Sequence, residues 1–249
     1  MKSSVCLLMI VFSAVIVTGQ KAENGGLAPA EQAYNKGLDL QAAGDLDGAI
    51  AAYTRALELD RYYPEAYNNR GNARMNKGDL IAAIADFTEA IRYRPDGYEG
   101  YYNRGVAYLM QEDYSAALSD FNRSIEISPK LITAYHNRGN AYRGLKKTKE
   151  AIADYTKAVE IFPFADAYYS RGIANEDAGN TDLALADYTR AIELNPKFAR
   201  AFANRGLILL QRGKDEEAQR DFDAAFQLDS GLRSEFEEFI KKTREARKG

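Results

Sequence analysis

The sequence contains one cysteine, Cys6, and one histidine, His136, among its 249 residues. A disulfide framework is therefore excluded, and a metal site built from cysteine and histidine is nearly excluded as well. The chain also lacks a surplus of positive charge, because 33 basic residues stand against 36 acidic ones, for a net charge of −3. Nucleic-acid-binding surfaces are normally clearly basic. We therefore expect no metal, no cofactor and no nucleic-acid partner.

The sequence has no apolar run long enough to cross a membrane comfortably. Its longest apolar run extends from Val5 to Val17, whereas a spanning helix needs about 20 residues. Lys2 precedes this run, and the small residue Gly19 follows it, as in a secretory signal that is cut before Gln20. We predict a signal peptide at residues 1–19, a polar linker at 20–29, and export to the periplasm or secretion. The alternative is an uncleaved N-terminal anchor, which would be the chain's only contact with a membrane.

Catalytic motifs are missing too. The sequence shows no nucleophile with a neighbouring base and no glycine-rich phosphate loop of either common pattern. His136 is the only histidine, and we interpret it as a binding-surface residue and not as a catalytic base. We predict that the protein is not an enzyme.

The sequence does contain a strong internal repeat. The pentapeptide at Tyr101–Gly105, Tyr-Tyr-Asn-Arg-Gly, returns in related form at 67–71, 135–139, 168–172 and 202–206. A fixed period near 34 residues is typical of stacked helical repeats. Counting the pentapeptide glycine as position 8 of its repeat defines six units, at residues 30–63, 64–97, 98–131, 132–164, 165–198 and 199–232.

Several positions keep the same residue type in all six repeats. Position 8 is glycine, position 20 is alanine, position 24 is tyrosine or phenylalanine, and position 27 is alanine or serine. Positions 4, 8 and 11 lie on one helical stripe, and positions 20, 24 and 27 on another. Glycine or proline follows each stripe in most repeats, where a helix must end. Each repeat is therefore predicted to form a helix, a tight turn and an antiparallel helix.

This pattern resembles the tetratricopeptide repeat (TPR) family and covers residues 30–232. The resemblance implies an all-α fold, a right-handed superhelix of helix pairs. After the last repeat, Leu232, Phe236, Phe239 and Ile240 are spaced so that they share one helical face. We predict a C-terminal capping helix at residues 233–249 that closes the open end of the stack; a basic helix that binds a membrane or a partner is the alternative.

Position 6 is asparagine in five of the six repeats. In the TPR family this face of the first helix lines the concave groove, so we expect the asparagines to bind the backbone of a peptide there. A carboxamide both donates and accepts hydrogen bonds. The alternative is that the asparagines bond neighbouring helices. The predicted groove residues are Asn35, Asn69, Asn103, Asn137 and Asn204, with Tyr34, Tyr102, His136 and Tyr169 at position 5 as exposed contact residues.

Charged residues recur at two further positions. Position 7 is arginine and position 23 is aspartate in repeats two to six, whereas the first repeat has Lys36 and Ala52 and lacks both. A buried guanidinium needs an anion, so we predict an ion pair within each repeat. An aspartate that reaches the next repeat's arginine is the rival geometry. The predicted pairs are Arg70–Asp86, Arg104–Asp120, Arg138–Asp154, Arg171–Asp187 and Arg205–Asp221.

Together these features predict an exported scaffold or adaptor that binds a protein or peptide in its concave groove. A second hypothesis is a structural component that assembles with itself or with an envelope complex and has no peptide ligand. The sequence does not decide the oligomeric state.

Overall fold

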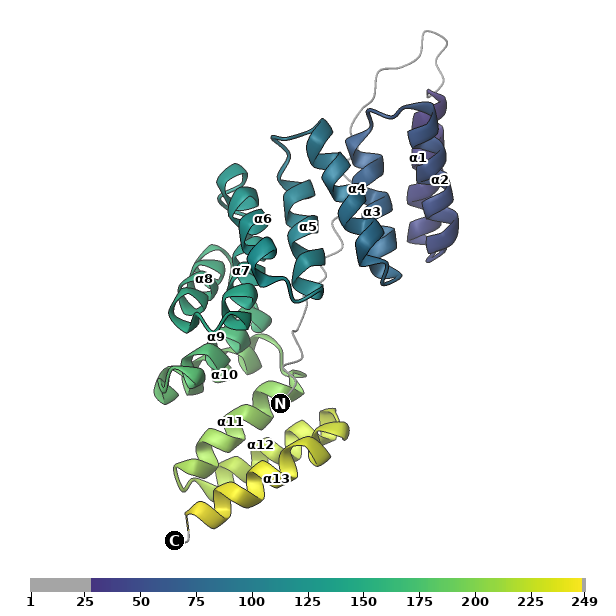
Figure 1. Cartoon of the computed structure of the whole chain (residues 1–249). Helices are drawn as coiled ribbons and strands as arrows, with labels where there is room; N and C mark the ends of the chain where they lie inside the picture. The colour runs from purple at the N-terminus through teal and green to yellow at the C-terminus, as the bar shows by residue number, and fades with distance from the viewer. Residues whose placement is uncertain (1–27, 248–249) are drawn as a thin grey trace. The chain divides into compact units, whose positions relative to one another are not determined.

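The computed structural model describes residues 28–247, and every regular element in that range is an α-helix (Figure 1). These residues form two compact units, 28–144 and 145–247. The first contains α1 (Pro29–Ala42), α2 (Leu46–Leu59), α3 (Pro64–Asn76), α4 (Leu80–Tyr93), α5 (Tyr98–Met110), α6 (Tyr114–Ile127) and α7 (Ile132–Gly144). The second contains α8 (Thr148–Ile161), α9 (Ala165–Asp177), α10 (Thr181–Leu194), α11 (Ala199–Gln211), α12 (Asp215–Leu228) and α13 (Gly231–Ala246).

The predicted signal peptide and nearly all of the predicted linker lie outside the described residues. Export and cleavage therefore stay predictions. Among residues 28–247, no helix is both long and apolar enough to span a bilayer.

Helices pack in consecutive pairs within each unit. In the first unit, α1 packs on α2, α3 on α4, and α5 on α6; in the second, α9 packs on α10 and α11 on α12 (Figure 1). Each pair also contacts the first helix of the next, as α4 does with α5 and α10 with α11. This arrangement confirms the prediction of an all-α fold made of stacked helix pairs.

The position-8 glycine lets the two helices of a pair approach closely. A methyl group added at Gly71 would lie 2.6 Å from Cε1 of Phe87, the position-24 aromatic on the facing helix. Phe87 has no solvent exposure, so its ring has little room to move. The same clash would occur in four other repeats, where the glycines Gly37, Gly105, Gly172 and Gly206 face the rings of Tyr53, Phe121, Tyr188 and Phe222.

The turn inside each repeat places one residue in the left-handed region. Gly78 has a φ of +84°, and Gly44, Gly179 and Gly213 are similar. Glu112 and Lys146 occupy the same position with φ values of 60° and 59°, although only glycine adopts this conformation without steric strain. The turn geometry is thus kept even where the sequence does not favour it. Asp45, Asp79 and Asp113 follow in the first three repeats and accept a backbone N–H as helix N-caps.

Helix α13 covers the end of the last helix pair. Leu232, Phe236 and Ile240 are buried in one cluster with Phe222 and Phe226 of α12. Arg247 donates a 2.9 Å hydrogen bond to the carbonyl of Leu210 and pairs with Asp215. The apolar face of α13 is thereby used within the unit, as a cap requires. Phe239 remains 39% exposed.

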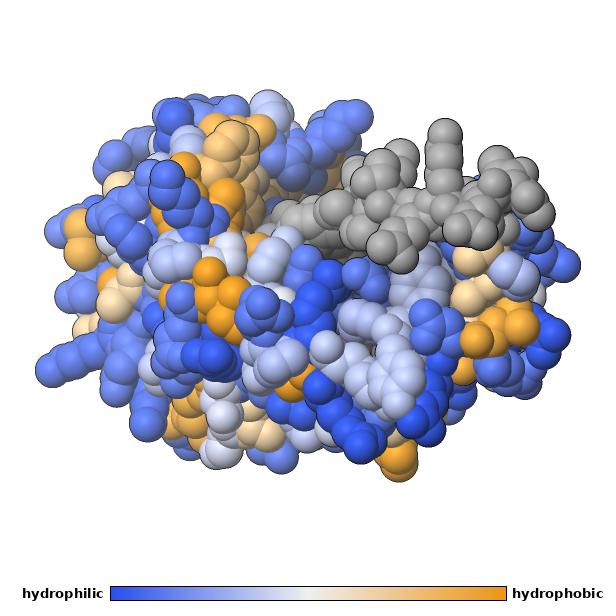
Figure 2. Space-filling view, turned by 90° about the horizontal axis from the view of Figure 1, so that it is seen from above, coloured by the Kyte–Doolittle hydropathy of each residue, from blue (hydrophilic) through white to orange (hydrophobic). Residues whose placement is uncertain are grey.

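On the face seen in Figure 2, hydrophilic residues predominate and apolar residues form separate small patches. Exposed large apolar side chains occur from Leu59 to Phe239 in the described range, and Ile81, at 79%, is the most exposed. Scattered apolar residues of this kind are normal on a folded surface.

Candidate functional site

Four of the predicted arginine–aspartate pairs are in contact in the structure. In each, Nε and Nη2 of the position-7 arginine donate to the carboxylate of the position-23 aspartate in the same repeat. The Nη2–Oδ1 distances are 2.7, 2.8, 2.7 and 2.8 Å for Arg70–Asp86, Arg104–Asp120, Arg171–Asp187 and Arg205–Asp221. These contacts have the within-repeat geometry and not the rival one. Arg138 and Asp154 belong to different units, so their pairing stays a prediction.

The aspartates are almost completely buried, with exposed fractions of 3% for Asp86 and 4% for Asp120. The arginines are partly accessible, since the Arg104 side chain is 20% exposed. Hydrogen bonding to the Asp120 carboxylate raises the pKa of Arg104, and Asp221 raises the pKa of Arg205 in the same way. Each pair is therefore a charged, bidentate contact, the strongest form of side-chain hydrogen bonding.

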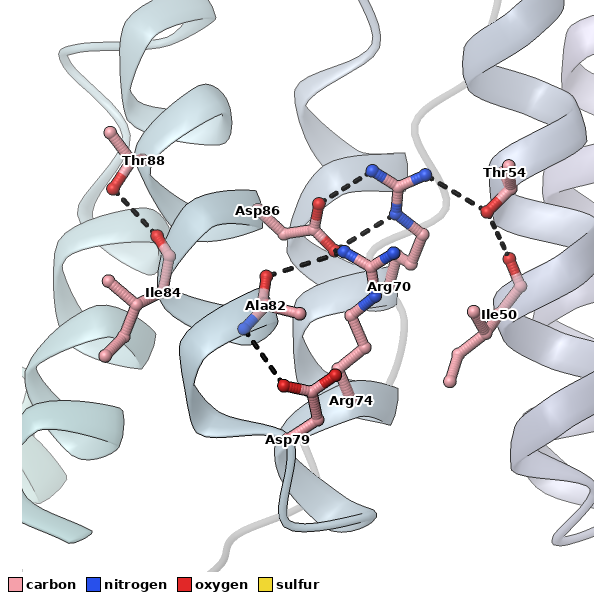
Figure 3. Close-up of polar contacts among 9 residues, drawn as sticks. All are labelled: Ile50, Thr54, Arg70, Arg74, Asp79, Ala82, Ile84, Asp86 and Thr88. Carbon is pink, nitrogen blue, oxygen red and sulfur yellow. Dashed lines mark hydrogen bonds and ion pairs between the residues drawn. The ribbon is translucent and has the colours of Figure 1, made fainter. Parts of the chain in front are cut away.

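The third guanidinium nitrogen reaches back to the preceding repeat. Nη1 of Arg70 donates to the Thr54 hydroxyl at 3.0 Å, and the Thr54 hydroxyl donates in turn to the carbonyl of Ile50 (Figure 3). The arginine thus joins two repeats as well as two helices. Equivalent bonds join Arg104 to Thr88, Arg138 to Asn122, Arg171 to Thr156, and Arg205 to Thr189. Sequence analysis missed this link, although threonine or asparagine recurs at position 25.

Two irregular residues at position 11 belong to the same network. Arg74 and Asn175 stand where the family usually has an apolar residue. Arg74 donates to Oδ2 of Asp86 at 2.8 Å (Figure 3), and Asn175 donates to Oδ2 of Asp187 at 3.0 Å. In both repeats the buried carboxylate gains an additional donor, which explains the departure from the family pattern.

Three of the position-6 asparagines bond the tyrosine at position 5 of the preceding repeat. The Nδ2 atoms of Asn69 and Asn137 donate to the hydroxyls of Tyr34 and Tyr102, at 2.8 and 3.1 Å, in the first unit. In the second unit Asn204 donates to Tyr169 at 3.3 Å. The alternative interpretation, that the asparagines bond neighbouring helices, therefore describes these three. Asn35 has no preceding repeat. For Asn103, position 5 of the preceding repeat is Asn68 and not a tyrosine.

The position-5 residues are not the exposed contact residues that we expected. Tyr102 and Tyr169 are each 7% exposed and His136 is 1% exposed. The Tyr169 ring packs between Tyr188 and Phe198, with centroid distances of 5.7 and 4.7 Å. Burial raises the pKa of Tyr102, and burial also raises the pKa of Tyr34 to about 12. The prediction of exposure is wrong here because packing between repeats covers this edge of the helix.

The asparagine face of the first unit, meaning Asn68, Asn69, Asn103 and Asn137, holds two unused acceptors. Oδ1 of Asn68 and Oδ1 of Asn137 are buried and have no hydrogen-bond partner within the described chain. Asn137 is 1% exposed and its Nδ2 already binds Tyr102. Leaving a buried acceptor without a donor is unfavourable by about 1–3 kcal/mol. Both oxygens are therefore acceptors for which the described chain supplies no donor.

The buried Tyr188 is expected to make the free energy of unfolding depend on pH in the alkaline range. Its ring is fully buried and its hydroxyl donates to Glu176 at 2.8 Å. Burial raises the pKa of Tyr188 far above its ordinary value. A raised folded-state pKa contributes stability that is complete below about pH 10, the unfolded pKa, and is lost as the pH rises above it. We expect Tyr188→Phe to flatten the loss of stability between pH 10 and 12, measured by urea unfolding. Equal slopes for the wild type and Tyr188→Phe would contradict this.

Within residues 28–247, no group of three or more His, Cys, Asp or Glu side chains is arranged to hold a metal ion.

Family models for the tetratricopeptide repeat match residues 68–132, 132–164, 165–198 and 187–220, and a TPR repeat model matches 37–78. No curated protein sequence matches the chain. Among solved structures, MamA is 31% identical with a TM-score of 0.61, over 66% of this chain and 96% of MamA. MamA 41-end from Desulfovibrio magneticus RS-1 is 22% identical with a TM-score of 0.64, over 69% and 98% of the two chains. YrrB, described as a TPR protein with an unusual peptide-binding site, is 24% identical with a TM-score of 0.60, over 72% and 93%.

The chain belongs to the tetratricopeptide repeat proteins. Its fold is the all-α TPR solenoid, which presents extended surfaces to other proteins and is typically non-catalytic. It is a protein-interaction scaffold, and its partners are proteins or peptides.

Proposed function

We propose that this protein is an exported scaffold that holds an extended peptide segment of a partner against its asparagine face. The observation that carries the proposal is the buried, unpartnered Oδ1 of Asn137, whose amide nitrogen is already engaged by Tyr102. The Tyr102 bond fixes the orientation of the carboxamide, so its acceptor is held in place before a ligand arrives. Asn68 Oδ1 offers a second acceptor on the same face.

Backbone N–H groups are the donors that any peptide sequence supplies. Neither acceptor is charged, so the site does not select an anionic or a cationic side chain. YrrB is described as having a peptide-binding site, which supports a peptide as the kind of ligand for this fold. It does not indicate where on this chain the peptide binds.

The test uses peptides selected for binding from a random display library. We expect Asn68→Ala and Asn103→Ala each to lower the affinity for a selected peptide by about fivefold. This corresponds to the loss of one hydrogen bond of about 1 kcal/mol. Asn180→Ala, at an exposed position just before α10 that makes no side-chain cap bond, is the control and should not change the affinity. A peptide N-methylated at single backbone positions should lose affinity at the positions that face these residues. Unchanged affinity in both variants and in all N-methyl peptides would refute the site.

Asn137→Ala serves as a separate diagnostic because it also removes the bond to Tyr102. We expect it to reduce both peptide affinity and the free energy of unfolding, the latter by about 1 kcal/mol. A change in stability alone would assign Asn137 a structural role only.

Export is tested by fractionation of a Gram-negative host. We expect osmotic shock to release a chain whose N-terminus, by mass spectrometry, lies near Gln20, because the apolar run at 5–17 is short. The full-length chain in a salt-washed membrane pellet would instead indicate an anchor.

A further inference from the structure

Tyr62 is the exposed tyrosine of this chain, and its ring contacts another tyrosine. All 17 tyrosines of the sequence lie within the described residues, and Tyr62, at 59%, is the one among them that is exposed. It lies in the turn between α2 and α3, at the end of the first repeat. Its ring meets the ring of Tyr93, the last residue of α4, edge-on, with a centroid distance of 5.3 Å and an interplanar angle of 82°. The contact therefore joins the first repeat to the second.

The chain offers few other groups to an oxidant that removes single electrons. The sequence has no tryptophan, and its one cysteine, Cys6, lies outside the described residues. Met110 is 37% exposed, but methionine is oxidised by gaining an oxygen atom to form a sulfoxide. Within the described part of the chain, the phenol of Tyr62 is therefore the group that a one-electron oxidant reaches first by direct contact.

The surroundings of the two phenols allow Tyr62 to react and to move. Arg61 donates a hydrogen bond to the Tyr62 oxygen, and its guanidinium carbon lies 4.6 Å from the centroid of the ring. The bond uses the oxygen as an acceptor, so the hydroxyl hydrogen of this exposed side chain can pass to water. Tyr93 stacks on Tyr67 with a centroid distance of 5.7 Å, which holds it in place. Tyr62 lies in a turn and can swing toward it.

We propose that Tyr62 and Tyr93 form a site of oxidative cross-linking, where a dityrosine bond joins the first two repeats. The oxidant is of the haem-peroxidase class and uses hydrogen peroxide. It removes one electron and one proton from each phenol, and the peroxide that accepts them becomes two molecules of water. The two phenoxyl radicals then form a carbon–carbon bond between the ring carbons next to their hydroxyl-bearing carbons. The hydrogen on each bonded carbon moves to the oxygen and restores the phenol.

The position of the bond gives it a structural effect. It would close a loop from residue 62 to residue 93, which contains α3 and α4. A cross-link that closes a loop restricts the unfolded chain and thereby stabilises the folded one. Because the two rings already touch, coupling within one molecule is favoured over coupling between molecules. In a chain without a disulfide framework, this bond would serve as a covalent staple between repeats.

The test treats the dilute full-length protein with a haem peroxidase and hydrogen peroxide. We expect dityrosine fluorescence from a product that migrates as a monomer on a denaturing gel. Fragmentation of its proteolytic peptides by mass spectrometry should place the bond at Tyr62 and Tyr93, with the loss of two hydrogen atoms. Tyr62→Phe and Tyr93→Phe should each remove this product. A bond between other tyrosines, or cross-linked dimers without the internal bond, would overturn the proposal.

Two neighbouring tyrosines provide matched controls. Tyr63 follows Tyr62 in the sequence but packs on Tyr34, with a centroid distance of 4.9 Å, and Tyr67 stacks on the other partner, Tyr93. Tyr63→Phe and Tyr67→Phe should therefore both keep the cross-link. Phenylalanine retains the ring in all four variants, and circular dichroism checks that the fold is kept. Loss of the product in Tyr67→Phe with its retention in Tyr62→Phe would assign the bond to a different pair.

Urea unfolding tests whether the bond acts as a staple. The purified cross-linked protein should unfold at a higher urea concentration than the untreated protein. Tyr62→Phe, exposed to the same oxidant, should show no such increase, which separates the effect of the bond from other oxidation. Equal midpoints for the cross-linked and untreated proteins would overturn the stabilising role.

Discussion

Replacing Asp120 by alanine is expected to lower the free energy of unfolding by about 3 kcal/mol. Asp120 is 4% exposed and accepts two hydrogen bonds of 2.8 Å from Arg104. Its removal leaves a guanidinium whose side chain is only 20% exposed without a counter-ion. The expected loss lies at the lower end of the range for broken buried pairs, because Arg104 retains some access to water.

Urea unfolding of Asp120→Ala and of Glu126→Ala compares the buried ion pair with a surface ion pair. Glu126→Ala breaks the Arg123–Glu126 pair on the same helix, where the side chains are 49% and 64% exposed. Exposed pairs contribute little, so this change should alter the free energy of unfolding by less than about 0.5 kcal/mol. A loss below that value for Asp120→Ala as well would show that its charge is effectively solvated.

Replacing Gly71 by alanine should destabilise the protein by about 2 kcal/mol, although alanine is the better helix former by about 1 kcal/mol. The new methyl group would lie 2.6 Å from Cε1 and 2.9 Å from Cδ1 of Phe87. Because Phe87 is fully buried, either the ring leaves its favoured rotamer or α3 and α4 move apart.

A second variant distinguishes steric conflict from other causes. Phe87→Leu removes the ring atoms that meet the new methyl group, so the double variant Gly71→Ala, Phe87→Leu should be more stable than the sum of the two single changes predicts. Thermal unfolding of all four proteins gives this coupling. Additive effects would mean that the close approach of the two helices is not what requires glycine.

The fold could be predicted from the sequence because the residues that meet the same packing requirement recur in all six repeats. Gly71 and Phe87 are informative only because equivalents recur at the same spacing. Arginine and aspartate were predictable as partners because both are missing from the first repeat, which has Lys36 and Ala52. Arg74 and Asn175 depart from the apolar residue type of position 11, and only the structure shows that each binds a buried aspartate of its own repeat.

Contacts between successive repeats were much harder to predict. The link from Arg70 to Thr54 and the bond from Asn69 to Tyr34 depend on how one helix pair is rotated against the next. The periodicity of a single helix shows which residues share a face, but not which part of that face the next repeat covers. Tyr102 was therefore expected at the surface and is buried instead.

The position-7 arginine bonds both the aspartate of its own repeat and the threonine of the preceding repeat. This double contact affects how cooperatively each unit unfolds. In a linear array, cooperativity depends on the balance between the intrinsic stability of a repeat and the coupling to its neighbours. Loss of the Arg104 side chain would weaken both terms together, since this residue bonds Asp120 in its own repeat and Thr88 in the one before. Within a unit, a repeat cannot unravel without also releasing a bond in its neighbour, so partly unfolded arrays should be sparsely populated.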